Sequence, residues 1–464
     1  MKIQQFKDKG LSQYSYAILN DGIPGQHARQ PEIILIDPSR SITPYLDFAL
    51  QNNAIIAAVI ETHPHADFIS GHLELSNTTG APIYCSRLLG ATYPHHPFDE
   101  GDIIPLGNIQ LKAMNTPGHS PDSISILLQQ GQKDIAVFTG DTLFIGDCGR
   151  PDLRENAGNI TARREELAGQ MYHSLRDKLM PLSDEVIVYP AHGAGTLCGR
   201  SLSDASYSTI GEEKRSNWSL QEMSQEAFIK ALTADQPFVP GYFPYDVELN
   251  KKGAENLNTA LSKVTRGKPI TLNPLLYIID TRSANDFKKG HLPGSINIQK
   301  DGKFETWLGS IISPGENFYI TTSDEAELKN ILPRAATIGY EVFIDHAFFT
   351  AGAEETTIPA NVRETTEKLN LGSFRNHLSD YTIIDIRSAE EVKNHPLFNN
   401  ALNIPLPELR QRTREVPLDK PIVVHCAGGY RSAIGSSLLQ NSIGRQTKVF
   451  DLGETIKDFL SPIR

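Results

Sequence analysis

The 464-residue chain has few cysteines and no long apolar or basic segment, and each absence excludes a class of protein. Its 4 cysteines are spread over the whole length, which is too sparse for a disulfide framework and indicates a reducing compartment. No apolar stretch approaches the roughly 18 residues of a membrane span, and the start lacks the apolar core of a signal peptide. The net charge of -11 includes no basic run to attract nucleic acid or acidic lipid.

These absences together predict a cytoplasmic protein whose partners are small molecules. We expect no nucleic acid and no membrane among those partners. The sequence leaves open whether the chain forms a homo-oligomer.

The length favours several domains, because a domain typically has roughly 150 residues. In the first 250 residues, short apolar strands alternate with helical stretches such as 161–179, where apolar residues recur every fourth position. The segment 238–245 is rich in proline, glycine and aromatic residues, as expected at the end of a domain. We therefore predict an α/β domain over residues 1–250.

The second half of the chain contains an internal repeat. The segment 276–283, with the pattern Ile-Ile-Asp-x-Arg-Ser, reappears about 105 residues later as 382–388. An Asn-Ile pair follows in nearly the same register, at Asn297 in one copy and Asn403 in the other. Each copy is typical of a small α/β domain with a parallel sheet. We place the first repeat at 262–357 and the second repeat at 362–464, with their join near 357–361.

Four apolar strands in the first domain each end at potential metal ligands. Imidazole and carboxylate groups at the ends of separate strands can meet at one sheet edge when the chain folds, so the pattern predicts a metal site there. The groups are His63, His65 and Asp67 after strand 55–60, His119 after strand 109–114, Asp141 after strand 135–138, and His192 after strand 186–189.

In order and spacing, this set of residues resembles the metallo-β-lactamase superfamily over about 240 residues. The resemblance implies an αββα sandwich with metal at one sheet edge. One departure is informative: the family's fuller motif has a histidine directly after the aspartate, and this chain has Phe68. In the binuclear zinc hydrolases that histidine holds a second metal, which a phenyl ring cannot do. We therefore expect a single metal.

The remaining residues fit a different chemistry. Two imidazoles and one carboxylate on one face of a metal leave positions open, as in non-haem Fe(II) oxygenases, so O₂ and a sulfur substrate can bind together. The segments 138–144, 146–152 and 172–175 resemble the persulfide dioxygenases, the branch that oxidises the outer sulfur of a low-molecular-weight persulfide to sulfite. This resemblance implies one Fe(II) per chain, held by His63, His119 and Asp141.

The same resemblance implies roles for the neighbouring residues. It places His65, Asp67 and His192 around the metal without binding it, where such groups orient ligands and substrate. It also places Cys148 and Arg150 near the substrate. As a separate hypothesis, Cys198 assists the handover of sulfur. 

The second repeat carries a further motif, Cys-Ala-Gly-Gly-Tyr-Arg, from Cys426 to Arg431. A cysteine that follows a buried strand and precedes a glycine loop and a helix is surrounded by backbone N–H groups, which stabilise anionic sulfur. The motif resembles the rhodanese loop, with Cys426 as the carrier of sulfane sulfur, Arg431 as an oxyanion partner, and Gly428, Gly429 and Tyr430 around the substrate. The first repeat has Thr321 and Thr322 at the corresponding point, so it resembles a catalytically silent rhodanese domain.

We thus expect a two-activity enzyme that oxidises a persulfide with O₂ to sulfite and transfers sulfane sulfur through Cys426, for instance onto sulfite to form thiosulfate. One alternative is a zinc thioester hydrolase similar to glyoxalase II joined to a sulfurtransferase, since zinc accepts the same ligands. A second alternative is a metal-bearing module that senses sulfur species. The sequence does not identify the thiol that carries the persulfide.

Overall fold

The computed structural model describes residues 1–20, 30–154, 164–199, 202–269, 271–350 and 363–460. The chain separates into two compact units, which are described one at a time. The N-terminal unit is Met1–Ala260 with Ala336–Gly339, and the C-terminal unit is Leu261–Ala335 with Tyr340–Arg464. The predicted ends of the repeats at 357 and 362, and the join at 357–361, lie outside the described residues. The other predicted domain boundaries stay predictions.

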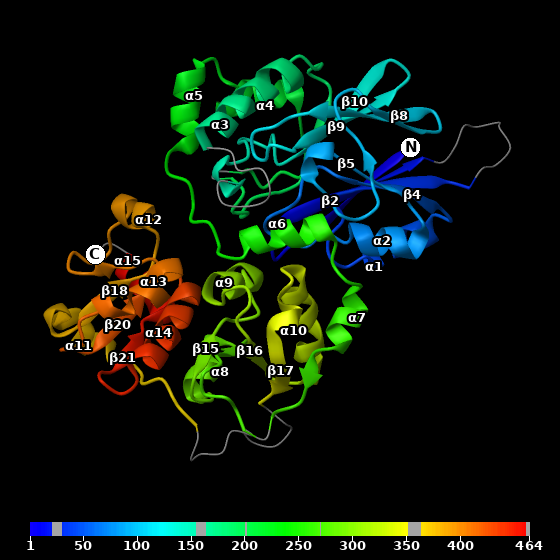
Figure 1. Ribbon diagram of the computed structural model, residues 1–464. Helices are drawn as coiled ribbons and strands as arrows, with labels where there is room; N and C mark the ends of the chain where they lie inside the picture. Colours follow the sequence, from blue (N-terminus) through cyan, green and yellow to red (C-terminus); the bar gives the residue numbers. More distant parts are fainter. Residues whose placement is uncertain (21–29, 155–163, 200–201, 270, 351–362, 461–464) are drawn as a thin grey trace. The chain divides into compact units, whose positions relative to one another are not determined.

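The N-terminal unit contains two six-stranded mixed sheets (Figure 1). In both sheets the strands lie side by side in the order in which they occur along the chain. The first sheet has the order β1 (Lys2–Asp8), β2 (Gln13–Asn20), β3 (Glu32–Ile36), β4 (Ile55–Glu61), β5 (Ile83–Cys85), β6 (His96–Pro97), and the second has β12 (Ser208–Thr209), β11 (Ile187–Pro190), β10 (Lys133–Gly140), β9 (Ile124–Gln130), β8 (Ile109–Asn115), β7 (Ile103–Leu106).

The core of this unit lies between the two sheets. Ile34 and Ile60 of the first sheet belong to the same buried cluster as Leu111, Ile126 and Phe138 of the second. The outer face of each sheet is apolar as well, and helices cover it. Four layers result, and the predicted αββα sandwich is confirmed.

Helices α1 (Thr43–Gln51) and α2 (His72–Thr79) pack on the first sheet through Tyr45, Phe48 and Leu75. Helices α3, α4 and α5 pack on the second. The predicted helix over 161–179 begins outside the described residues and then runs as α3 and a π-helical segment, Ser174–Leu179. The remaining bounds are α3 (Arg164–His173), α4 (Ile210–Ser216), α5 (Gln225–Thr233), α6 (Phe243–Lys252) and α7 (Leu257–Ser262).

The C-terminal unit has two parallel sheets, one in each repeat, as predicted. The two sheets share one strand order, since β14, β15, β16 and β17 of the first repeat correspond to β18, β19, β20 and β21 of the second. The first sheet has the order β13 (Thr265–Arg266), β17 (Ile344–Phe349), β16 (Phe318–Thr322), β14 (Ile278–Asp280), β15 (Ser295–Asn297), and the second has β19 (Leu402–Asn403), β18 (Thr382–Asp385), β20 (Ile422–His425), β21 (Val449–Asp451).

Helices flank both sheets of this unit. The longest, α14, packs on β20 and β21 of its own repeat and on β15 of the first. The bounds are α8 (Ala284–Lys289), α9 (Phe304–Ile311) and α10 (Glu325–Thr337) in the first repeat, and α11 (Leu371–Asn376), α12 (Ala389–Asn394), α13 (Leu406–Arg412), α14 (Tyr430–Ile443) and α15 (Lys457–Leu460) in the second.

The repeated Asp-x-Arg motif is a structural device in both copies. Arg387 donates hydrogen bonds from Nε and a terminal nitrogen to the carboxylate of Asp385, at 2.6 to 3.1 Å, and the Asn403 amide donates to the carbonyls of both residues. Arg282, Asp280 and Asn297 make the same contacts in the first repeat. The motif therefore fixes the turn after the buried strand, which explains why it persists in the repeat without a cysteine.

Across the part of the chain that the structure describes, no helix is both long enough and apolar enough to cross a membrane. The cytoplasmic location stays a prediction.

Candidate metal centre and sulfur-transfer loop

Three of the predicted ligands meet where the ends of the two N-terminal sheets face each other. His63 follows β4, His119 follows β8 and Asp141 follows β10 directly. The Nε2 atoms of His63 and His119 lie 3.7 and 3.4 Å from Oδ2 of Asp141, and all three side chains are buried. The ligand atoms of this trio lie within 4.8 Å of one another, close enough to share one metal ion.

The other ring nitrogen of each histidine is fixed by a hydrogen bond. His119 Nδ1 donates to the carbonyl of Arg150 at 2.9 Å. His63 Nδ1 lies 3.0 Å from the Thr62 hydroxyl, which itself donates to Asp37 Oδ2 at 2.8 Å and therefore accepts from the imidazole. These partners place the proton on Nδ1 and direct the Nε2 lone pair of each ring to the shared point, as in metal-binding histidines.

Asp141 is oriented in the same way. Its Oδ1 accepts a hydrogen bond from His192 Nδ1 at 2.7 Å, which leaves Oδ2 facing the two histidines. Burial alone would raise the pKa of Asp141, but the charge and hydrogen bond of His192 hold it well below its usual range. The carboxylate is therefore ionised and ready to bind a cation.

Two further observations indicate that the trio suits a metal ion. His63 Nε2 and Asp141 Oδ2 are buried and have no hydrogen-bond partner among the described residues, which is costly unless another ligand is present. Burial lowers the pKa of both His63 and His119, so both rings are neutral and can donate a lone pair. This donor set suits iron or zinc.

Phe68 and His192 lie beside His65, next to the trio. The Phe68 ring is 1% exposed and stacks against His65, with 4.3 Å between ring centroids. His192 Nε2 lies 2.9 Å from Asp67 Oδ2, so both ring nitrogens face carboxylates, and although burial opposes it, Asp141 and Asp67 raise the pKa of His192 well above its usual value.

Cys198 lies beside this pair. Its sulfur atom lies close to the ligand atoms of Asp67 and His192, and all three side chains are buried. Burial and then the charges of Asp67 and Asp141 raise the pKa of the Cys198 thiol well above its usual value. A neutral, buried thiol is a poor nucleophile. Its role in sulfur handover stays a hypothesis.

Arg150 and Cys148 are both buried, and Cys148 belongs to the apolar cluster between the second sheet and its helices. The Arg150 guanidinium donates to both carboxylate oxygens of Asp152 at 2.7 and 2.6 Å and to the carbonyl of Pro237 at 2.6 Å. These contacts hold Arg150 in place, and its carbonyl in turn accepts the hydrogen bond that orients His119, a candidate metal ligand. Between the two residues, Gly149 is required, because a Cβ there would lie 1.9 Å from the Asp141 carbonyl oxygen.

Two residues of this site were missed in the sequence. Asp37 directly follows β3 and accepts hydrogen bonds from the backbone and hydroxyl of Thr62 at 2.8 Å each, while its Oδ1 lies 3.2 Å from His65 Nε2. The signal was available, since Asp37 is a carboxylate after a fifth apolar strand. Thr62 gave no signal in the sequence, because a threonine next to a histidine is common.

In the second repeat, Cys426 follows β20 and precedes α14. Its buried sulfur accepts a hydrogen bond from the Gly429 backbone N–H at 3.1 Å. Gly429 has a φ of 102°, and a Cβ there would lie 2.8 Å from the backbone nitrogen of Glu454. Only glycine fits both the conformation and the space, so the loop can turn its N–H groups to the sulfur.

Arg431 pairs with a carboxylate of its own chain. Both terminal nitrogens donate to Glu391, at 2.7 and 2.6 Å. Burial alone would raise the pKa of Glu391, but Arg431 lowers it to about 2. The predicted role of Arg431 as an oxyanion partner is untested, and Glu391 occupies its donors here. The sequence signal for Glu391 was its place in the capping box that Ser388 begins.

Replacing Glu391 with glutamine is expected to destabilise the protein by about 1 kcal/mol at pH 7, since both partners are partly exposed. The folded-state pKa is depressed, so the stabilisation exists above the unfolded-state pKa of about 4.3 and disappears as pH falls towards about 2. Calorimetric unfolding should show the largest deficit at pH 7 and little at pH 2.5. Glu390→Gln on the same helix is the control. An equal deficit at both pH values would contradict the ion-pair account.

The first repeat has no counterpart of this loop. At the end of β16, the Thr322 hydroxyl donates to the Asp324 carbonyl, and Asp324 Oδ1 accepts from the Glu327 backbone at 2.9 Å. Asp324 thus caps α10 in the ordinary way. The chain after β16 is therefore an ordinary capped helix start, and not a loop around a sulfur atom.

The comparisons with known proteins agree with this geometry. The family model of the metallo-beta-lactamase superfamily matches residues 32–192, and that of the rhodanese-like domain matches residues 261–344 and 370–461. Human persulfide dioxygenase ETHE1 is 30% identical over 203 residues, which cover 43% of this chain and 71% of that protein. Hydroxyacylglutathione hydrolase GloC of Haemophilus influenzae is 28% identical, with 39% of this chain and 84% of that protein covered.

Among solved structures, a metallo-beta-lactamase from Staphylococcus aureus has a TM-score of 0.66 at 32% identity, and the match covers 75% of this chain and 99% of that one. The fold and the family matches define a metallo-β-lactamase-type domain, with a candidate metal centre, joined to rhodanese-like repeats. The chain belongs to the metallo-β-lactamase superfamily, as an ETHE1-like domain followed by two rhodanese-like domains.

Proposed function

We propose that the chain is a non-haem iron persulfide dioxygenase coupled to a sulfurtransferase. The N-terminal unit would convert a low-molecular-weight persulfide, O₂ and water into a thiol and sulfite. The second repeat would transfer sulfane sulfur through a persulfide on Cys426, for instance onto sulfite to give thiosulfate. The observation that carries the first activity is the convergence of His63 Nε2, His119 Nε2 and Asp141 Oδ2 on one point.

One metal and an oxygenase reaction follow from the same residues. Two imidazoles and a carboxylate occupy one face of a metal and leave the opposite positions open. Iron bound there supplies redox chemistry towards O₂ and the persulfide sulfur. The similarity to human ETHE1, which is a persulfide dioxygenase, supports iron over zinc.

The chain's own residues would prepare the site in three ways. Thr62 and the Arg150 carbonyl hold the two imidazoles in the tautomer that leaves Nε2 bare. His192 holds the carboxylate of Asp141. The Phe68 ring fills the neighbouring space with hydrocarbon, so water is excluded from that side of the site.

A zinc thioester hydrolase remains the competing function, because zinc accepts this ligand set and the chain is also similar to GloC, a hydroxyacylglutathione hydrolase. Such an enzyme needs water and no O₂. The dioxygenase therefore consumes O₂, whereas the hydrolase does not.

The test compares protein loaded with Fe(II) and with Zn(II). With glutathione persulfide, the Fe(II) form is expected to consume one O₂ for each sulfite formed, at a rate that falls to background under nitrogen. The Zn(II) form should consume none. Hydrolysis of S-lactoylglutathione by the Zn(II) form, together with no O₂ uptake by the Fe(II) form, would refute the dioxygenase and favour the hydrolase.

A further inference from the structure

The loop between β4 and α2 is buried along its whole length. This metal loop, residues 62–71, carries His63, His65 and Asp67, and each of its residues is buried. Loops normally lie at the surface, because the backbone N–H and C=O groups of a buried loop cannot pair with water. The backbone groups of the metal loop therefore need partners within the protein.

The start of the metal loop is held at the ends of the two sheets. The backbone N–H and the hydroxyl of Thr62 donate to Asp37, which follows β3, at 2.8 Å each. The Thr62 carbonyl accepts from the backbone N–H of Ile124, the first residue of β9, at 2.9 Å. These contacts fix the chain directly before His63.

The side chain of Asn250, on α6, holds the rest of the metal loop. Its Nδ2 donates to the carbonyls of His65 and Phe68 at 2.8 and 2.7 Å, and its Oδ1 accepts from the Ser70 N–H at 2.8 Å. Asn250 is 2% exposed. An amide side chain has two N–H donors and one carbonyl acceptor, so this residue uses both donors and its acceptor on one loop.

A short piece from much later in the chain pairs with the same loop. The N-terminal unit includes Ala336–Gly339, which we call the turn 336–339. The Thr337 carbonyl accepts from the Ile69 N–H at 2.7 Å, and the Gly339 carbonyl accepts from the Tyr245 hydroxyl of α6 at 3.2 Å. The turn therefore contacts both the metal loop and the helix behind it.

Gly339 shows how closely this turn is packed. Its φ is 67°, and a Cβ there would lie 2.9 Å from the Leu249 side chain, 3.0 Å from the Tyr245 ring and 3.4 Å from Ile69. Only glycine fits both the conformation and the space. A side chain at this position would push the turn away from α6.

Both supports lie outside the part of the chain that matches the metallo-beta-lactamase superfamily model, residues 32–192. The turn 336–339 lies within residues 261–344, which match the rhodanese-like domain. A segment of the silent repeat is thus part of the N-terminal unit.

We propose that Asn250 is a positioning residue of the candidate metal centre, and that the turn 336–339 assists it. Both act through the backbone of the metal loop. Asp37 holds the loop before His63 and Asn250 holds it from His65 onwards, so the ligand between them is fixed from both sides. Metal ligands need to be held within about 0.5 Å of their working positions. The inference rests on the proposed metal centre.

Asn250→Asp tests this role with almost no change in size. A carboxyl group has at most one hydrogen to donate where the amide has two, so at least one of the carbonyls of His65 and Phe68 loses its partner. The Kd for Fe(II), measured on the full chain by competition with a chelator, is expected to rise about 10- to 100-fold, as for other residues that support a metal ligand.

Asn403→Asp is the matched control. The Asn403 amide also donates to two backbone carbonyls, those of Asp385 and Arg387, at 2.8 and 2.9 Å, but in the second repeat. Because it belongs to the other unit, this change should alter the Kd for Fe(II) by less than about twofold.

A spectroscopic measurement separates positioning from a general loss of stability. With Co(II) in place of Fe(II), the visible absorption bands depend on the arrangement of the ligands. A displaced His63 should shift or weaken these bands in the folded Asn250→Asp chain. A change that only lowered stability would leave the bands of the folded chain as they are in the parent.

Gly339→Ala tests the turn 336–339 separately. The added methyl group should displace the turn and raise the Kd for Fe(II) about threefold, less than Asn250→Asp, because the turn makes one hydrogen bond to the loop. Gly315→Ala is its control, since Gly315 has a φ of 91° and a Cβ there meets nothing within 4 Å. It introduces similar backbone strain without a collision and should bind Fe(II) as the parent does.

The outcomes distinguish this inference from the proposed function. An unchanged Kd and an unchanged Co(II) spectrum in the folded Asn250→Asp chain would overturn the inference and leave the dioxygenase standing. Should Asn250→Asp not fold, a Gly339→Ala chain with the Kd of the parent overturns it instead. Equal losses in Gly339→Ala and Gly315→Ala would remove the turn from the proposal. If the parent consumes no O₂ with glutathione persulfide but Asn250→Asp still weakens its metal binding, the proposed function is refuted and the positioning role stands.

Discussion

Replacing His63 with alanine is expected to abolish persulfide-dependent O₂ consumption and to leave sulfur transfer from thiosulfate to cyanide unchanged. His63 Nε2 is one of three donor atoms at the candidate metal centre. Even loss of a residue that only supports a ligand typically weakens metal binding about 10- to 100-fold, so loss of a ligand should cost at least about a hundredfold. The variant should also contain far less iron after purification with iron supplied.

The selectivity of this effect is the informative part. His63 belongs to the N-terminal unit, and Cys426 belongs to the C-terminal unit. Each activity has its own complete set of functional side chains, so the loss of one activity should not affect the other. Iron content and O₂ uptake measure the first site, and thiocyanate formation measures the second.

His96→Ala is the matched control, because His96 is an exposed histidine of β6 in the same unit and stacks on Tyr84 away from the trio. It should keep its iron and its O₂ uptake. A His63→Ala chain that loses both activities, with an unfolding profile like that of the parent, would show that the two sites are not independent.

Much of the fold follows from local patterns in the sequence. The alternating strands and helical stretches and the duplicated Asp-x-Arg turn predict an α/β domain and two parallel-sheet repeats, because burial and turn chemistry act over a few residues. The αββα sandwich was implied by the resemblance to the metallo-β-lactamase superfamily. The strand ends predict a metal site at one sheet edge, and the resemblance to the persulfide dioxygenases implies which three residues bind the metal. Asp141 stands directly after β10, whereas His63 and His119 lie in the loops that follow β4 and β8, and strand ends of packed sheets gather at an edge.

The contacts that support these residues could not be predicted from the sequence, because they join residues that are far apart in the chain. The pairing of Arg431 with Glu391 spans two helices, and the sequence alone suggested instead that Arg431 receives an external anion. The hydrogen bond from His119 to the Arg150 carbonyl uses a backbone atom that every residue has. The π-helical segment that follows α3, Ser174–Leu179, carries the same every-fourth apolar spacing as an α-helix.

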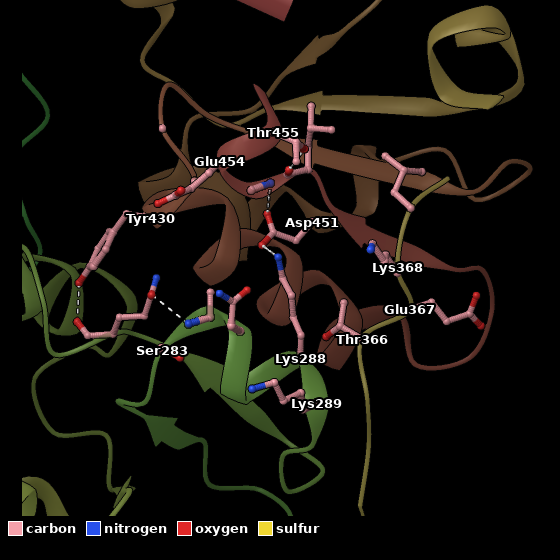
Figure 2. Close-up of a pocket in the computed structure, with 18 of the residues that line it drawn as sticks. Ser283, Lys288, Lys289, Thr366, Glu367, Lys368, Tyr430, Asp451, Glu454 and Thr455 are labelled. Carbon is pink, nitrogen blue, oxygen red and sulfur yellow. Dashed lines mark hydrogen bonds and ion pairs between the residues drawn. The ribbon is translucent and has the colours of Figure 1, made fainter. Parts of the chain in front are cut away.

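The interface between the two repeats, part of which is drawn in Figure 2, is a further case. It depends on how two domains pack, and no motif encodes it. The contact between Tyr430 and the Gln299 carbonyl, for example, joins a motif residue to a backbone atom of the other repeat. A repeat that has lost its nucleophile therefore reads as silent in the sequence, although its surface borders the active loop.

Replacing Cys426 with serine is expected to reduce sulfur transfer from thiosulfate to cyanide by at least about a thousandfold, because the residue that carries the sulfur is removed. The serine hydroxyl can still accept the Gly429 N–H, so the loop should keep its shape. A hydroxyl cannot accept a sulfane sulfur under these conditions. O₂ uptake with glutathione persulfide should continue, but the product should be sulfite without thiosulfate.

Cys85→Ser is the matched control, since Cys85 is also buried and burial raises its pKa to about 12, which makes it unreactive. It should retain both activities. Mixing the Cys426→Ser and His63→Ala chains supplies the decisive measurement, because sulfite released by the first can diffuse to Cys426 of the second. Thiosulfate should then reappear at a rate that rises with the concentration of the His63→Ala chain. Continued thiosulfate formation by Cys426→Ser alone, at the rate of the parent chain, would remove Cys426 from the transfer and with it the reason for joining these domains in one chain.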